Sequence, residues 1–101
     1  MSLGTVMVLH ALARGREYGF DIMEETGLTS GTIYPALDRL ERLGCAFSEW
    51  EDALIAREEK RPARRYFRIT PMGQQALAVA LDRYRSLAPV DLPGTVRPRT
   101  T

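Results

Sequence analysis

The chain has 101 residues, of which 45% are hydrophobic and 27% charged, and its formal net charge is +1. A chain of this length forms one small domain with a thin core, so oligomerisation is a favourable way of burying more apolar surface. Because the sequence holds one cysteine, Cys45, and one histidine, it cannot form an internal disulfide or supply the usual zinc ligands, and we expect no metal and no cofactor.

Positive charge is concentrated directly after the middle of the chain. Residues 1–52 have a net charge of −5, residues 53–71 a net charge of +4 and residues 72–101 a net charge of +2. Basic residues of the segment 53–71 can therefore neutralise several phosphates of a nucleic-acid partner.

The first predicted helix covers residues 3–13, LGTVMVLHALA, which are apolar on nearly every side. Such a helix is covered on most of its circumference. The run is too short to span a bilayer and lacks the basic start and cleavage signature of a secretory signal, so we expect a cytoplasmic protein without a membrane partner. A shorter helix is predicted over residues 18–26, with Gly27 as its left-handed cap.

The next helix is predicted within residues 27–44, GLTSGTIYPALDRLERLG. Its apolar residues recur every three to four positions and define one buried face, formed by Ile33, Leu37 and Leu40. Pro35 is tolerated only near the start of a helix, because its ring blocks the normal hydrogen bond. Thr29, Ser30 and Thr32 can each accept a hydrogen bond from the free N–H groups at the helix start. If Thr32 is the N-cap, Pro35 costs little, whereas a cap at Ser30 requires a distorted first turn.

Two strands follow the third helix. Residues 45–51, CAFSEWE, and residues 64–70, RRYFRIT, have the length and composition of strands. The connecting residues 51–63 are polar towards their end and contain Pro62, so we expect a hairpin with a long loop.

A last helix is predicted from Pro71, with Thr70 as its N-cap, to about Leu87. Its apolar residues have coiled-coil spacing and, with the apolar first helix, predict a homodimer. The expected interface consists of Leu3, Met7, Leu77, Leu81 and Tyr84. Residues 89–101 hold three prolines and little apolar content, so we expect a disordered tail.

This order of elements predicts a mainly α fold with a small antiparallel β-hairpin, namely a winged helix-turn-helix over residues 1–70 and a C-terminal dimerisation helix over residues 71–88. In that fold the third helix enters the DNA major groove. On a helical wheel its face opposite the buried one carries Gly31, Thr32, Pro35, Arg39 and Arg42, with Tyr34 on the flank. The alternative for the two arginines is a solvated surface.

The hairpin supplies further candidates for DNA contact. Lys60 and Arg61 lie next to the rigid Pro62 and are the best candidates for the tip of the wing. Arg64 is a further candidate for a phosphate contact. A charged hairpin surface without a nucleic-acid partner is the alternative.

Several stretches resemble the PadR family of transcriptional regulators over roughly residues 3–85. They are YGFDI, LTSGTIYPALDRLERLG, the hairpin with Trp50, and KRPARRYFRITPMG. The resemblance implies a homodimeric, mostly repressing regulator whose C-terminal helix packs against its partner. It also implies release from DNA by a small aromatic effector, which several family members show.

The resemblance also assigns residues by position. Tyr18 and Gly19 begin the supporting helix, and the entry of the DNA-facing helix is formed by Ser30, Gly31, Thr32, Tyr34 and Pro35. Arg61 and its neighbours become the wing. The chain departs from the family pattern in the apolar stretch ALIA at residues 53–56 and in Ala63.

The remaining side chains leave alternatives open. Trp50 could contact an aromatic effector, although a lone hairpin tryptophan more often covers the core, and Cys45 is expected to be a small buried hydrophobe. We predict a regulator that binds a double-stranded DNA operator. The alternative is a winged helix for protein recognition, such as a phage or plasmid accessory factor, which the acidic first half favours. An enzyme is disfavoured because no residues combine nucleophile, base and orienting roles.

Overall fold

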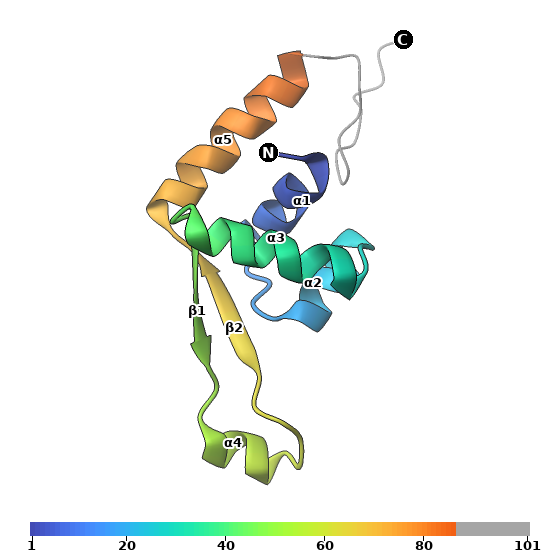
Figure 1. The fold of residues 1–101 in the computed structure, drawn as a ribbon, viewed down its shortest axis with the longest axis vertical. Helices are drawn as coiled ribbons and strands as arrows, with labels where there is room; N and C mark the ends of the chain where they lie inside the picture. Colours follow the sequence, from blue (N-terminus) through green and yellow to red (C-terminus); the bar gives the residue numbers. More distant parts are fainter. Residues whose placement is uncertain (87–101) are drawn as a thin grey trace.

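The computed structural model describes residues 1–86, so the predicted tail at 89–101 and the predicted end of the last helix lie outside the described residues. The described chain folds into helices and a two-stranded antiparallel sheet, as predicted (Figure 1). In chain order the elements are α1 (Leu3–Ala13), α2 (Gly19–Thr26), α3 (Ser30–Arg42), β1 (Ala46–Trp50), α4 (Ala53–Glu58), β2 (Arg65–Ile69) and α5 (Pro71–Ser86).

Helix α1 lies at the centre of the helical body and contacts α2, α3, α5 and β2. Its Val8, Leu9 and Ala11 have no exposed surface at all. The prediction of a helix covered on most sides is confirmed, because neighbours pack on several faces of its apolar cylinder. None of the helices in residues 1–86 is long and apolar enough to cross a membrane.

The buried face of α3 is the predicted one. Ile33, Leu37 and Leu40 are each at most 1% exposed, and Ala36 lies beside them. Burial of three large aliphatic side chains contributes about 1.5–3 kcal/mol each by apolar transfer and fixes the rotation of the helix about its axis. The rotation in turn decides which residues α3 presents outward.

The start of α3 corrects the predicted cap. The N-cap is Thr29, with extended backbone and no capping hydrogen bond from its side chain, and Ser30 is already the first helical residue. The Thr32 N–H donates to the Thr29 carbonyl at 3.0 Å, a tight first turn. Pro35 therefore lies in the second turn, where its missing N–H leaves the exposed Gly31 carbonyl without a helical partner.

Strands β1 and β2 pair from Ala46 opposite Ile69 to Trp50 opposite Arg65. The connection between them is not the predicted loop, because residues 53–58 form the short helix α4. The Asp52 carboxylate accepts a hydrogen bond from the Leu54 N–H at 2.8 Å and caps this helix. An N-cap aspartate followed by good helix formers outweighed the polar residues and the proline further on. We call residues 51–64, including α4, the wing segment; it lies at the end of the hairpin remote from the helical body (Figure 1).

The start of α5 is anchored at the corner where α3 leads into β1. The Gly73 N–H donates to the Thr70 hydroxyl at 3.0 Å, which confirms the predicted cap. The same hydroxyl donates to the Gly44 carbonyl at 2.6 Å, and the Thr70 N–H donates to the Cys45 carbonyl at 3.0 Å. We call this arrangement the Thr70 junction; from it α5 runs away from the hairpin (Figure 1).

Candidate functional site

The outward face of α3 has the composition expected from the helical wheel. Its predicted members are all exposed, namely Gly31, Thr32, Pro35, Arg39 and Arg42. Arg42 pairs with Asp38 at 3.4 Å, but both side chains are about two-thirds exposed or more, so this pair is weak. Within residues 1–86, no carboxylate lies within 4.0 Å of the Arg39 guanidinium. This face therefore offers small residues at the helix start and cations further along.

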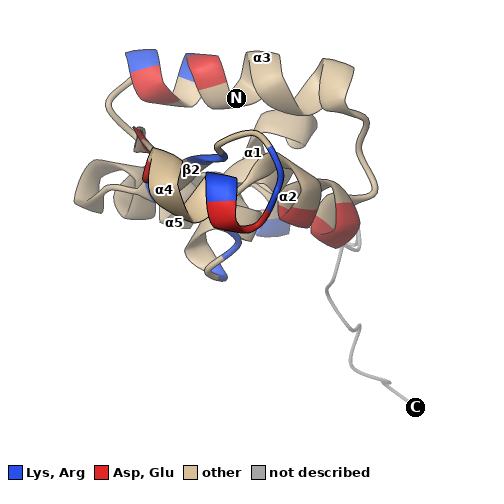
Figure 2. Ribbon diagram, turned by 90° about the horizontal axis from the view of Figure 1, so that it is seen from below, with Lys and Arg blue, Asp and Glu red and all other residues tan. Residues whose placement is uncertain are grey.

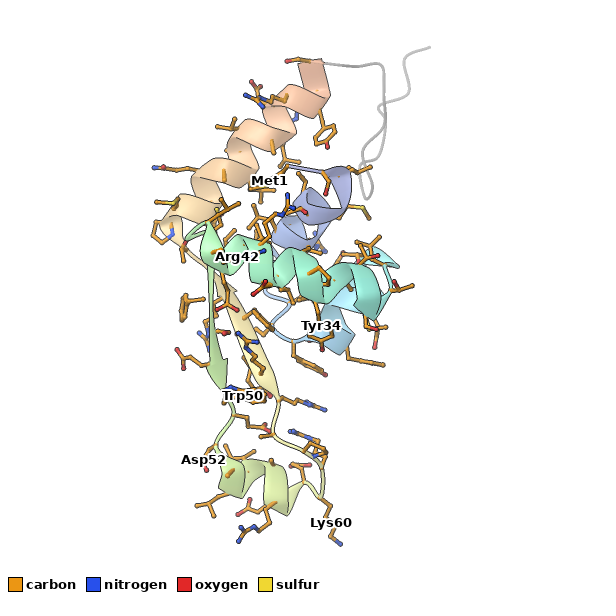
Figure 3. All side chains as sticks on the ribbon, in the orientation of Figure 1. Met1, Tyr34, Arg42, Trp50, Asp52 and Lys60 are labelled. Atoms are coloured by element: carbon orange, nitrogen blue, oxygen red, sulfur yellow. The ribbon has the colours of Figure 1, made fainter. Side chains whose placement is uncertain are left out.

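Tyr34 lies at the flank of α3 (Figure 3) and is 50% exposed, and its hydroxyl lies beside Gly19. A Cβ atom at position 19 would overlap this hydroxyl. Glycine at the first residue of α2 thus allows the tyrosine of α3 to approach. The Tyr34 hydroxyl can occupy this place only because residue 19 has no side chain.

Tyr18, the N-cap residue of α2, links the helical body to the hairpin. Its ring meets that of Tyr66 edge to face, with centroids 5.8 Å apart, and the Arg64 guanidinium lies 4.4 Å from its centroid. A guanidinium over an aromatic ring is held by a cation–π interaction. Of the described carboxylates, none is within 4.0 Å of the Arg64 guanidinium, so its charge is available at the junction between the hairpin and α2.

The carboxylate of Glu51 lies inside the wing segment, with its side chain only 6% exposed. Arg61 donates to both of its oxygens, at 2.6 and 2.9 Å, and the Tyr66 hydroxyl donates at 3.2 Å. The Arg64 N–H adds a longer contact of 3.3 Å. The Arg61 hydrogen bonds, above all, lower the pKa of Glu51 from 4.5 to about 2, and the pair raises the pKa of Arg61.

The two residues predicted for the tip therefore differ. Lys60 projects from the end of the wing segment (Figure 3), whereas the Arg61 side chain is 24% exposed and turned onto Glu51. Lys60 has a left-handed backbone, with φ 56°, directly after α4. The sequence does not reveal the pairing, since Glu51 and Arg61 lie ten residues apart and meet only because the segment folds back.

The basic residues of β2 hold the hairpin to the helical body. Arg65 donates to Glu41 of α3 at 2.8 Å and to Ser48 of β1 at 3.0 Å. Arg68 pairs with Glu17 at 3.5 Å. Glu41 was not among the predicted site residues, and it fixes the hairpin against the C-terminal half of α3.

Cations and anions alternate on this side of the molecule. Figure 2, viewed from the hairpin end, shows Lys and Arg interspersed with Asp and Glu on α3 and α4 rather than one continuous basic surface. Three hairpin arginines are paired with carboxylates, namely Arg61, Arg65 and Arg68. The unpaired positive charge near α3 thus depends on few side chains.

Trp50 does not cover the core, so that interpretation is wrong: its side chain is 69% exposed near the end of the hairpin (Figure 3). Leu54 and Ile55 of α4 are exposed as well, at 63% and 49%. Cys45 is buried, as expected. The wing segment is therefore partly apolar on its outside.

The predicted dimer residues occupy different environments. Leu77 is 6% exposed and packs in the core of its own chain, and Leu81 and Tyr84 are partly buried against that core. Met7 is half-buried, and Leu3 is 42% exposed. An open groove of about 550 Å³ runs beside α5 and the first residue, lined by Met1, Met72, Gln75, Ala76, Val79, Ala80, Arg83 and Tyr84.

Residues 8–79 match the family described as "Transcriptional regulator PadR-like family". Solved structures share the fold. A PadR-like transcription factor from Bacteroides fragilis is 23% identical with a TM-score of 0.69, over 82% of this chain and 81% of that one. A PadR family transcription regulator from Clostridium difficile is 21% identical with a TM-score of 0.71, over 85% and 91%.

A PadR family transcriptional regulator from Eggerthella lenta is 26% identical, with a TM-score of 0.63 over 79% of this chain and 72% of that one. Comparison with curated protein sequences gave no match. The family match covers the region that contains α2, α3 and the hairpin.

Proposed function

Because the chain belongs to the PadR-like family of transcriptional regulators, we propose that it binds a DNA operator sequence-specifically, as a homodimer, and represses transcription. One observation carries the proposal more than any other. The exposed face of α3 has small residues at its start and, further along, Arg39, which has no carboxylate partner in residues 1–86, while Arg64 lies on the Tyr18 ring.

The composition of this face suits a major groove. A recognition helix brings its N-terminal residues closest to base edges, and Gly31 and Thr32 leave room for that approach. Arg39 can contact a base or a phosphate, and Arg64 and Lys60 can neutralise phosphates beside the groove. Arg61, which is paired with Glu51, supports the wing in this proposal and does not contact DNA itself.

The groove beside α5 supports the homodimer. Val79 and Met72 are each 57% exposed and line the same groove, and a second copy of the chain would cover them together. A two-fold dimer binds a pseudo-palindromic operator with half-sites about one helical turn apart. Because this role is exerted on genomic DNA, the proposal includes a cytoplasmic location.

Release by a small aromatic effector is the remaining part of the proposal. Trp50 is exposed enough to stack on such a ligand. Since it is the single tryptophan of the chain, quenching of its fluorescence by phenolic acids reports contact directly. Unchanged fluorescence at millimolar ligand would remove Trp50 from this role.

The proposal is tested by selecting bound sequences from a random DNA library with the purified full chain. We expect a pseudo-palindromic consensus, and we expect Arg39→Ala to weaken binding to it by about 1–3 kcal/mol, the range for a base contact. Arg85→Ala, which removes an equal charge from an exposed site on α5, is the matched control and should bind like the wild type.

A winged helix used for protein recognition is the competing function, and the exposed Leu54 and Ile55 favour it. It predicts no enrichment of any sequence at moderate salt. That result would refute the proposal of a sequence-specific regulator.

A further inference from the structure

Glu51 is the least exposed of the ion-paired carboxylates in residues 1–86, although Trp50 before it and Asp52 after it are exposed. Both of its oxygens have partners. One oxygen accepts from Arg61 and from the Arg64 N–H, and the other accepts from Arg61 and from the Tyr66 hydroxyl. A carboxylate with several donors at low exposure is held in one place.

These donors come from the far half of the wing segment and from β2. The Glu51 N–H also donates to the Arg64 carbonyl at 2.7 Å, so the two chain ends of the wing segment meet at this residue. The Arg61 N–H in turn donates to the Ala56 carbonyl of α4 at 3.1 Å. One carboxylate therefore connects the entry of the wing segment, its exit and, through Arg61, its helix.

The same contacts also fix the backbone at or next to Lys60 and Arg64, two cations that have no carboxylate partner in residues 1–86. The Arg64 backbone is bound to Glu51 on both its N–H and its carbonyl side, and its guanidinium is left over the Tyr18 ring. Lys60 directly precedes the anchored Arg61 and closes α4 with a left-handed φ of 56°, its N–H donating to the Arg57 carbonyl at 3.0 Å. Through Arg61 and the Arg64 backbone, Glu51 thus holds the stretches of chain from which both positive charges project.

We infer that Glu51 is a positioning residue for DNA binding, which orders the wing segment so that Lys60 and Arg64 face the same duplex as α3. The inference rests on the proposed function. A different role for Glu51 makes the opposite forecast: if the carboxylate merely withholds Arg61 from phosphates or repels DNA, its removal strengthens binding.

The test compares Glu51→Gln with Glu58→Gln in the full chain, on the operator selected by the wild type. Both variants lose one negative charge from the same segment, but Glu58 is exposed and has no ion-pair partner within residues 1–86. We expect Glu51→Gln to bind about tenfold more weakly, and its salt dependence, log K against log salt, to be shallower by roughly 0.9 for each phosphate that the wing segment no longer neutralises. Glu58→Gln should bind as tightly as the wild type or slightly more tightly.

The salt slope separates positioning from loss of folded protein, because a smaller active fraction lowers the apparent affinity without changing the slope. If Glu51→Gln folds poorly, Tyr66→Phe removes one donor only and should shift affinity and slope in the same direction by less. Equal or tighter binding by Glu51→Gln, or weaker binding with the wild-type slope, would overturn the inference.

Limited trypsin digestion without DNA provides an independent measurement. We expect faster cleavage after Lys60 in Glu51→Gln than in the wild type or in Glu58→Gln, because the wing segment loses its anchor. Equal cleavage rates would contradict the ordering role. If the wild type selects no operator, the proposed function is wrong. If the wild type selects an operator but Glu51→Gln does not bind it more weakly with a shallower salt slope, only the role of Glu51 is wrong.

Discussion

At the scale of single residues, the contact between Gly19 and Tyr34 shows how the size of one side chain determines the place of another. The hydroxyl of Tyr34 occupies the space that a Cβ at position 19 would fill. The tyrosine ring is consequently held between α3 and α2 instead of pointing freely into solvent.

Gly19→Ala should therefore destabilise the fold by about 1 kcal/mol, through overpacking against Tyr34. In a Tyr34→Ala background the same change should be neutral or stabilising, because alanine is the better helix former and the obstruction is gone. Urea unfolding of the four proteins measures this coupling. Gly31→Ala, whose Cβ would have only the Thr29 hydroxyl nearby at 3.9 Å, is the control and should not destabilise. Additive effects of the Gly19 and Tyr34 changes would contradict the contact.

The titration of Glu51 gives a second prediction at this scale. Its pKa is about 2 in the folded chain and near 4.5 without these partners, so its ionised form stabilises the folded state. This contribution is complete above about pH 4.5 and is lost as the pH falls towards 2, because protonation removes the acceptors of Arg61.

The difference in free energy of unfolding between the wild type and Glu51→Gln should therefore shrink between pH 4.5 and pH 2. Urea titrations across this range, with Glu58→Gln as the control, provide the measurement. A difference that stays constant down to pH 2 would show that the carboxylate titrates outside this window.

At the scale of elements, α5 depends on a close approach that only glycine permits. A Cβ at position 73 would overlap the Cys45 carbonyl and the Ile69 side chain. Unlike the tyrosine at Gly19, a backbone carbonyl cannot swing aside. The corner between α3 and β1 would have to move together with the hydrogen bonds of the Thr70 junction.

We expect Gly73→Ala to lower the free energy of unfolding by about 2–3 kcal/mol. Gln74→Ala, at the next and exposed position, should be neutral or slightly stabilising because alanine favours helix. Chemical denaturation compares the two variants. Equal stability would mean that the corner adapts to a methyl group at little cost.

The elements themselves could be predicted where spacing or a cap signal is strong. The face of Ile33, Leu37 and Leu40 and the start of α5 at Thr70 follow from local rules. Helix α4 was missed because a six-residue helix has too few turns for periodicity, although Asp52 before ALIA was a usable signal. The choice of Thr29 as the N-cap could not be made from the sequence, because Thr29, Ser30 and Thr32 all carry a hydroxyl that can accept from the free N–H groups of a helix start.

The site was less predictable than the fold. The outward face of α3 follows from its buried face, since the two are geometrically linked. The ion pairs Arg61–Glu51 and Arg65–Glu41 join residues that are distant in the sequence. They could not be predicted from charge and spacing, because they depend on how the folded segments meet. Trp50 was expected to cover the core, as hairpin tryptophans often do. It is exposed because the hairpin extends beyond the helical body, so the end of β1 lies away from the core.

At the scale of the whole molecule, the groove beside α5 makes the proposed dimer testable. Val79→Glu places a charge in the groove lining, one turn from Arg83, and should shift the protein to a monomer, because burying charged side chains in an interface costs several kcal/mol even when they are paired. Operator affinity should fall with it, since each monomer reads one half-site.

Light scattering over a concentration series, together with operator binding, checks this expectation. Gln74→Glu adds the same charge to α5 at an exposed position outside the groove lining, and it should leave the dimer intact. A wild-type chain that remains monomeric at tens of micromolar would contradict the proposed assembly.

The Thr70 junction has a mechanical consequence for such an assembly. A single residue separates β2 from α5, and its hydroxyl and N–H are both bonded to the corner at Gly44 and Cys45. Because only Thr70 lies between them and it is held on both sides, the direction of α5 is coupled to the direction of the hairpin. In the proposed dimer, a few degrees of tilt in α5 between the two subunits would change the separation of the two wing segments, so the length of DNA that the dimer could span would depend on the helix at the opposite end of the molecule.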